Sequence, residues 1–221
     1  MASYTYGKSL DDSSNLQEQV NPFNYRAEYG ISAYDIKHNF VLSYNYELPV
    51  DKLLRAKNHF TEGWALSGIT RFATGLPVTL ASNGDNSLIY AQNNGINSVS
   101  IDLPNMSPGN LKVNQNPRNG QPYFNTALFT SNPPALGAQG DAPRRPFYGP
   151  GVNNFDMALH KITKLTESKT LELRIETFNT FNHAQFYGNG SVDGNINDAT
   201  FGEVVKAAPP RISQVALKLL F

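Results

Sequence analysis

Alternation of apolar and polar residues over segments of about ten residues is the feature that most constrains this chain. Between residues 36 and 48, Phe40, Leu42 and Tyr44 alternate with polar residues such as Asn45 and Glu47. A period of two residues places successive side chains on opposite faces of a β-strand. Helical periodicity is nearly absent, so the sequence predicts an all-β chain.

The predicted strands are long. Strands of soluble sandwiches have about 5–6 residues, whereas a tilted strand needs about 9–11 residues to cross a bilayer. Length therefore favours an antiparallel transmembrane sheet of about six strands. The segments are Ser3–Ser9, Ile36–Leu48, Gly63–Thr74, Asn154–Thr163, Thr170–Phe181 and Arg211–Phe221.

Composition narrows the classes of protein and of partner that fit this chain. Charged residues make up only 16%, below the usual share of about 25%, and Asn, Ser, Thr and Gly supply much of the polarity. The formal net charge of +0 gives no electrostatic reason to expect a nucleic-acid partner. The absence of cysteine excludes disulfide scaffolds and thiolate metal sites.

The connections between the predicted strands alternate between long and short, as in outer-membrane barrels with external loops and periplasmic turns. A structureless loop as long as Gly75–Val152 is rare in a compact soluble domain. In Asp51–Phe60, a polar turn with one helical twist is favoured over a short helix capped by Asp51. We expect Leu10–Asp35, Gly75–Val152 and Asn182–Pro210 outside, and Pro49–Glu62 and Lys164–Lys169 in the periplasm.

The parity of the alternation assigns side chains to the two faces of the sheet. The polar set is expected to line the lumen and the apolar set to meet lipid. The lumen-facing candidates are Asn45, Glu47, Arg71, Asp156, Glu172, Arg174 and Glu176. The lipid-facing candidates are Phe40, Leu42, Tyr44, Phe155, Leu159, Leu171 and Leu173.

Aromatic residues are expected near the ends of the lipid-facing band, where they form interfacial girdles. An ordinary hydrophobic core in a soluble sheet is the alternative interpretation. Strand length and loop alternation favour the girdle. Its candidates are Tyr4, Tyr44, Tyr46, Trp64 and Phe221.

The sequence predicts no catalytic, metal or cofactor site. Arg174 lies between Glu172 and Glu176 and would keep both carboxylates ionised, against acid/base catalysis. Asp193 begins a D-x-N-x-N calcium pattern that fails at both its glycine and its glutamate position. The four histidines show no metal-ligand spacing, and His38 and His160 are expected on polar faces.

The end of the chain carries an apolar alternation that is predicted to be an assembly signal. A closed barrel must pair its last strand with its first, so the lipid face stays apolar to the terminus. The members are Val215, Leu217, Leu219 and Phe221.

Several segments resemble known proteins in the same order along the chain. ISQVALKLLF resembles the C-terminal signal that the barrel-assembly machinery reads in outer-membrane proteins. YTYGKSLDD, RAEYGISAYDIKHNFVLSYNYELP, GWALSGITRFATGLPVTL and LRIETFNTFNHAQF add to the likeness. Together they resemble the last strands of TonB-dependent receptors, especially the group with an N-terminal carboxypeptidase-regulatory-like domain.

This resemblance implies a barrel of about 22 strands closed by a plug. Residues 1–221 are then the C-terminal segment of the barrel, without plug or N-terminal strands, since small barrels begin at about eight strands. The implied partners are outer-membrane lipid, the barrel-assembly machinery, the missing strands and plug, and TonB through that plug. The implied activity is energy-dependent import of a siderophore, vitamin, oligosaccharide or peptide, without enzymatic chemistry.

Three alternatives stay open. A secreted β-sandwich could bind polysaccharide through exposed aromatic residues. A surface anchor or adhesin could use the barrel without transport. The chain could also be a truncated remnant without function.

Overall fold

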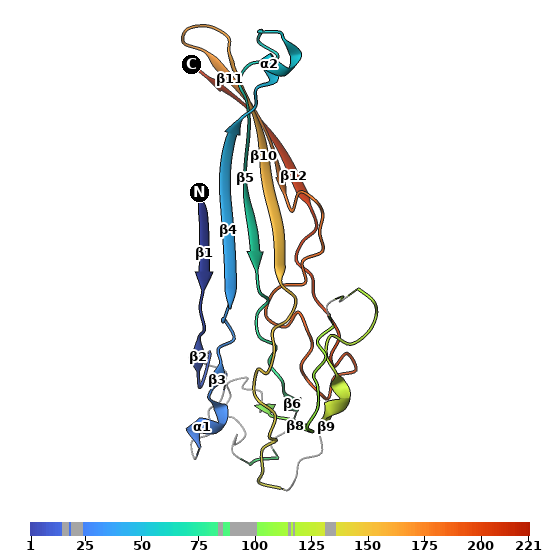
Figure 1. The fold of residues 1–221 in the computed structure, drawn as a ribbon. Coiled ribbons are helices and arrows are strands. Elements are labelled where there is room, and N and C mark those ends of the chain that lie inside the picture. The colour runs from blue at the N-terminus through green and yellow to red at the C-terminus, as the bar shows by residue number, and fades with distance from the viewer. Residues whose placement is uncertain are drawn as a thin grey trace.

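The computed structural model describes residues 1–14, 18, 24–83, 86–88, 101–114, 116, 118–130 and 136–221. Its main feature is one six-stranded antiparallel sheet with the order β1-β4-β5-β10-β11-β12 (Figure 1). Each strand pairs with the next one in that order, as in a meander. The strands are β1 (Ala2–Tyr6), β4 (His38–Glu47), β5 (Trp64–Ala73), β10 (Val152–Lys164), β11 (Thr170–Phe178) and β12 (Ile212–Leu220).

All six predicted strands are confirmed, with ends that differ by a few residues. The first strand stops at Tyr6, which forms the last pair with β4, and the chain then enters the long connection. The fifth stops at Phe178 because Asn179 takes a positive φ of 52° and turns the chain away from the sheet.

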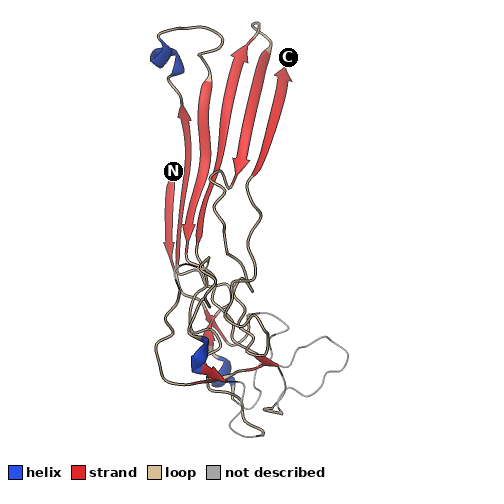
Figure 2. Ribbon diagram, turned by 90° about the vertical axis from the view of Figure 1, so that its right-hand side faces the viewer, coloured by secondary structure: helices blue, strands red, loops and turns tan. Residues whose placement is uncertain are grey.

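The connections divide between the two ends of the sheet as predicted (Figure 2). The turns between β4 and β5 and between β10 and β11 lie at one end. The three long connections lie at the other end, where they meet and pack together. We call this packed part, made from the described residues of 7–37, 74–151 and 179–211, the loop layer.

The β4–β5 turn contains α2 (Val50–Leu54), a single helical turn. The favoured interpretation of one helical twist in a polar turn is confirmed. The N-cap is Pro49, without a side-chain cap bond, so the alternative of a helix capped by Asp51 is wrong. The helix ends at Arg55 in the left-handed conformation, which terminates helical hydrogen bonding.

The expectation of a structureless loop at Gly75–Val152 is wrong. The layer contains α1 (Tyr25–Glu28) and the 3-10 helix η1 (Thr126–Leu128). It also contains three two-stranded ribbons. Their strands are β2 (Leu10–Asp11), β3 (Gly30–Ile31), β6 (Ser82–Asn83), β7 (Ile101–Asp102), β8 (Asn105–Met106) and β9 (Phe129–Thr130).

The hydrophobic core of the described residues lies in this loop layer. Phe124 is 2% exposed and lies at its centre, with its ring centroid 4.7 Å from that of Phe147 and 5.6 Å from that of Phe129. Leu80 is fully buried beside them. The layer therefore supports itself by burying apolar side chains, as a small domain does. The other buried members are Val78, Tyr123, Ala142 and Val192.

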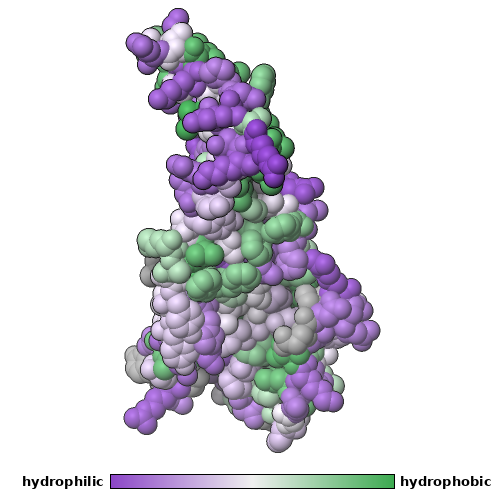
Figure 3. Space-filling model, turned by 45° about the horizontal axis from the view of Figure 1, so that its top comes forward, coloured by the Kyte–Doolittle hydropathy of each residue, from purple (hydrophilic) through white to green (hydrophobic). Residues whose placement is uncertain are grey.

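The sheet, in contrast, is a single layer. No second sheet covers either face among the described residues, and β1 and β12 form open edges. The described strands therefore do not form a β-sandwich, and they do not close into a barrel. Hydrophobic patches are exposed over the strands in the space-filling view (Figure 3). No helix in the described part of the chain has the length and apolar character needed to cross a membrane.

Candidate functional site

Residues directly opposite each other in antiparallel strands point to the same face of the sheet. Phe40 lies opposite both Tyr4 and Phe72, and following such pairs across the sheet defines the apolar face. All seven predicted lipid-facing residues and Val215, Leu217 and Leu219 share it, whereas contact with lipid stays a prediction. Its residues are Ala2, Tyr4, Tyr6, His38, Phe40, Leu42, Tyr44, Tyr46, Trp64, Leu66, Gly68, Thr70, Phe72, Asn153, Phe155, Met157, Leu159, Lys161, Thr163, Leu171, Leu173, Ile175, Thr177, Ser213, Val215, Leu217 and Leu219.

The opposite, polar face carries every one of the seven predicted lumen-facing residues. It also includes apolar side chains such as Ile69 and Ile162, so it is mixed and not uniformly hydrophilic. Acidic, basic and neutral polar groups nevertheless concentrate here. The charged residues are Glu47, Arg71, Asp156, Lys164, Glu172, Arg174, Glu176 and Lys218.

A polar cluster crosses the middle of this face. His160 Nε2 lies 2.8 Å from Ser67 Oγ on β5, and His160 Nδ1 lies 3.9 Å from Glu172 Oε1 on β11. Arg174 lies directly opposite His160 and donates from Nε to Glu176 at 2.7 Å. Side chains from three neighbouring strands are thereby joined into one hydrophilic row.

The cluster extends to β12 at the edge of the sheet. Lys218 is paired in register with Glu172, and the side-chain amide of Gln214 donates to Glu176. The sequence pattern did not identify Ser67, Gln214 or Lys218. The alternation within a strand shows which face each residue occupies. It does not show which residues of neighbouring strands lie opposite one another.

The remaining predicted lumen residues lie outside this cluster. Asp156 accepts a 2.8 Å hydrogen bond from the backbone N–H of Asn179 and fixes the end of β11. Arg71 lies toward the loop end, where it donates to Asn39 at 2.9 Å. Asn45 and Glu47 belong to the turn end of β4. A groove of about 540 Å³ runs over the polar face between these positions.

Ser67, His160 and Glu172 have the order of a hydrolytic triad, but their surroundings favour a structural row. Ser67 lies inside the central strand β5, in register with Asn45 on one side and Ala158 on the other. Backbone N–H groups inside such a strand are engaged in the ladders, so they are not available as an oxyanion hole. The absence of enzymatic activity stays a prediction.

His38 corrects one expectation. It was expected on a polar face, yet it lies opposite Tyr6 on the apolar face. Its Nδ1 lies 2.8 Å from the hydroxyl of Tyr4. The physical reason is parity, because His38 precedes Phe40 by two residues and must point the same way.

Aromatic residues concentrate at both ends of the apolar face. Phe72 packs edge-on against Phe155 at 5.6 Å near the loop end. Trp64 lies at the turn end, where its indole donates to the carbonyl of Phe60 at 2.8 Å. Lys161, the charged residue of this face, turns its ammonium toward the carbonyl of His59 and over the Trp64 ring. These positions match the two girdles of a membrane-spanning sheet.

Within the predicted girdle, Tyr4 lies at the loop end, and Tyr46 and Trp64 lie at the turn end. Phe221 follows β12 at the turn end and is 94% exposed. Tyr44 is placed one step inward, with its hydroxyl over Gly68, where the missing Cβ makes room for it. That contact covers a glycine in a strand with an aromatic ring.

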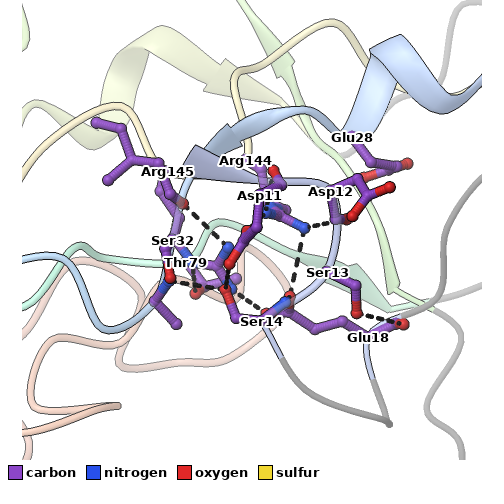
Figure 4. A network of polar contacts seen from close by, with 12 residues as sticks. Asp11, Asp12, Ser13, Ser14, Glu18, Glu28, Ser32, Thr79, Arg144 and Arg145 are labelled. Atoms are coloured by element: carbon purple, nitrogen blue, oxygen red, sulfur yellow. Dashed lines mark hydrogen bonds and ion pairs between the residues drawn. The ribbon is translucent and has the colours of Figure 1, made fainter. Parts of the chain in front are cut away.

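A buried ionic cluster joins two of the long connections (Figure 4). Arg144 donates to Asp11 at 2.5 Å, and the fully buried Arg145 pairs with Glu18. Arg145 also donates to Thr79 at 2.9 Å and to the carbonyl of Ile31 at 3.2 Å. These contacts connect the segment 7–37 to the segment 74–151.

Electrostatics in this cluster favour the ionised carboxylate. Burial by itself raises the pKa of Asp11, but hydrogen bonds from Ser14 and Ser32 and the charge of Arg144 lower it below its ordinary value. Burial lowers the pKa of Arg145, and the carboxylate of Glu18 opposes that shift. Asp11 is therefore held as a carboxylate beside the guanidinium of Arg144.

The side chains of the incomplete calcium pattern accept hydrogen bonds from within their own loop. Asp193 accepts from the N–H of Asn195 at 2.9 Å and from the hydroxyl of Thr200 at 2.5 Å. Asn195 accepts in turn from the N–H of Asn197 at 3.2 Å. No group of three or more His, Asp or Glu side chains suited to a metal ion occurs among the described residues.

Comparison with known proteins agrees with this geometry. The model of a family described as the outer membrane beta barrel domain matches residues 1–214. No curated protein and no solved structure shows significant similarity to the chain. Nearly all of the chain is covered by the family match, including the first five long strands, the loop layer and the first residues of β12. The chain therefore belongs to the outer membrane beta barrel domain family and lies in the bacterial outer membrane.

Proposed function

We propose that this chain forms part of the wall of a TonB-dependent active transporter that imports a nutrient across the outer membrane. The observation that carries the proposal is the separation of the two faces. One face holds eight charged residues, and the other holds Lys161, whose ammonium is turned onto backbone carbonyls. A barrel wall needs this asymmetry because one side meets lipid and the other meets a watery lumen.

The polar cluster suits a lumen wall. The row from Ser67 through His160 to Arg174 offers donors and acceptors across neighbouring strands. Such a surface can contact a plug or guide a polar ligand without holding it tightly. Long strands and the likeness of the segments to TonB-dependent receptors support the same function. A barrel of about 22 strands, in which these six close the wall, is part of the proposal.

The loop layer would be the part that meets the ligand first. It lies at the end of the sheet opposite the two short turns, and in barrels of this kind the long connections face the exterior. Its packed core would hold the encounter surface in one shape. Contact with TonB would occur through a plug, and insertion would use the alternation that ends at Phe221.

The test is uptake by living cells. We would delete the gene and measure accumulation of radiolabelled siderophore–iron, cobalamin, oligosaccharides and peptides, with and without TonB and the proton-motive force. The expected result is loss of uptake of one ligand class, equal to the loss caused by removing TonB. Unchanged uptake of every class would sink the proposal, and cell attachment that disappears without any loss of uptake would favour an adhesin.

A variant series addresses the wall itself. Arg174→Gln breaks the polar row, and Lys169→Gln in the exposed β10–β11 turn, which removes the same charge, serves as the matched control. With equal amounts in the outer membrane, the first variant should slow uptake and the second should not. Equal uptake by both variants would remove the polar row from the import path.

A further inference from the structure

A cavity of about 1030 Å³ lies where the loop layer meets the apolar face of the sheet. The sheet contributes Phe40 and Phe72 to its wall, and the loops contribute Val113, Phe147 and Phe186. Its size is just above the range of about 300–1,000 Å³ that is typical of ligand sites. The cavity is thus an aromatic-walled site at the level where the strands end.

The charge of this cavity is one-sided. Its described lining contains the cation of Arg118, and it contains no Asp or Glu. The guanidinium of Arg118 lies 5.8 Å from the ring centroid of Phe186, and its side chain is in none of the ion pairs between described residues. A cation that stacks on an aromatic ring without a carboxylate partner is ready to accept an anion.

One carboxylate lies behind the wall, and it is already engaged. Tyr148, a lining residue, donates its hydroxyl to Asp35 at 2.5 Å. The other oxygen of Asp35 accepts from the N–H of Ser9 at 2.6 Å. Asp35 is 3% exposed, so its charge is satisfied away from the cavity.

We propose that this cavity binds a phosphorylated glycolipid of the outer leaflet. An acyl chain would lie against Phe40 and Phe72, and a headgroup phosphate would accept hydrogen bonds from Arg118. The loop end of a lipid-facing sheet is the depth at which headgroups begin, so apolar and cationic groups occur there together. The inference rests on the orientation of the apolar face in the proposed function, but it does not need transport.

The position of the cavity distinguishes this occupant from an imported nutrient. Four of the sheet residues in its wall, Tyr4, His38, Phe40 and Phe72, belong to the apolar face. Ala73 and Val152 complete the wall where β5 ends and β10 begins, and they have the parity of the polar face. A nutrient passing along the polar face would lie on the opposite side of the sheet. A lipid in the surrounding leaflet reaches the cavity directly.

The experiment uses the full-length gene product in lipid nanodiscs and measures binding of a labelled diphosphorylated lipid A. Arg118→Gln should weaken binding about tenfold, the loss of one charge-assisted hydrogen bond. The matched control is Arg26→Gln, which changes an exposed arginine of the loop layer outside the cavity and should leave affinity unchanged. The same lipid without its phosphates should bind weakly to the native protein and equally to both variants.

Two outcomes would overturn the proposal. Equal affinity of Arg118→Gln and the native protein would show that the arginine does not hold the headgroup. Competition by free inorganic phosphate at the lipid concentration would show a simple anion site without use of the aromatic wall.

A second measurement separates this inference from the proposed function. Trp64 is the one tryptophan of these 221 residues and lies on the apolar face, so brominated acyl chains should quench the part of the fluorescence that is lost in Trp64→Phe. Quenching together with failed lipid A binding would overturn the glycolipid site alone. Absence of quenching would overturn the orientation of the sheet, and with it both proposals.

Discussion

Placing arginine at two adjacent positions of β4 tests the assignment of the faces. Leu42 lies opposite Ala2 and Thr70 on the apolar face, near the middle of the strand. Ser43 follows it, is exposed on the polar face and lies opposite Ile69. An arginine on the lipid side near the bilayer midplane costs about 2–4 kcal/mol, whereas an exposed substitution elsewhere changes stability by about 0.5 kcal/mol or less.

The two variants should therefore differ by about 1.5–4 kcal/mol, or about 10- to 700-fold in the folding equilibrium. Urea unfolding of the full-length gene product from lipid vesicles measures this difference. With a denaturant slope of about 2 kcal/mol/M, the Leu42→Arg midpoint should fall by about 1 M or more. Equal midpoints for Leu42→Arg and Ser43→Arg would refute the assignment, and a larger loss for Ser43→Arg would reverse it.

Three further predictions concern the loop layer and the end of the chain. Burial raises the pKa of Tyr123 to about 12. The contribution of its neutral hydroxyl to the stability of the layer should therefore be constant below pH of about 10 and be lost as the pH rises toward 12. Absorbance at 295 nm follows the ionisation, and near-ultraviolet dichroism follows the loss of packing. Glu18→Gln removes the carboxylate that pairs with the buried guanidinium of Arg145 and should destabilise the layer by about 3–5 kcal/mol, which limited proteolysis would show as faster cleavage. Lys57→Gln, in an exposed ion pair, should cost about 1 kcal/mol or less. Phe221→Ala should lower the amount of protein in the outer membrane at equal synthesis, and an unchanged amount would remove that residue from the assembly signal.

The strands could be predicted from sequence because each strand has different surroundings on its two faces. Alternation in β4 and β12 then reports the face of each side chain directly. The division of loops between the two ends follows from the antiparallel order. The number of strands in a complete barrel and the identity of the ligand leave no comparable periodic signal in these residues.

The core of the loop layer could not be predicted in the same way. Leu80, Phe124, Phe147 and Val192 are far apart in sequence, and no period connects them. Short ribbons such as β8 paired with β9 form because the backbone needs hydrogen bonds where side chains become buried. An Asn-, Gly- and Pro-rich composition hides this packing because the few aromatic residues that carry it are diluted along the segment.

The polar face shows the same limit at smaller scale. Parity placed Glu172, Arg174 and Glu176 together, since they belong to one strand. It could not bring Ser67 to His160, because that contact depends on the register between β5 and β10. Register is set by the pairing of whole strands and not by the pattern within one of them.

The two parts of the molecule are stabilised by different forces, so insertion and ligand capture should be separable by mutation. The sheet depends on cross-strand pairing and on its apolar face, whereas the loop layer depends on its aromatic core and the Arg144–Arg145 cluster. The buried side chain of Gln185 connects the two parts, because it accepts from the N–H of Asn153 at 2.9 Å and also donates to its carbonyl. It thereby extends the β10 ladder by one pair into the layer. A change in the aromatic core should therefore disturb ligand binding while the strands remain inserted, and a change on the apolar face should lower the amount of protein without altering the affinity of the molecules that insert.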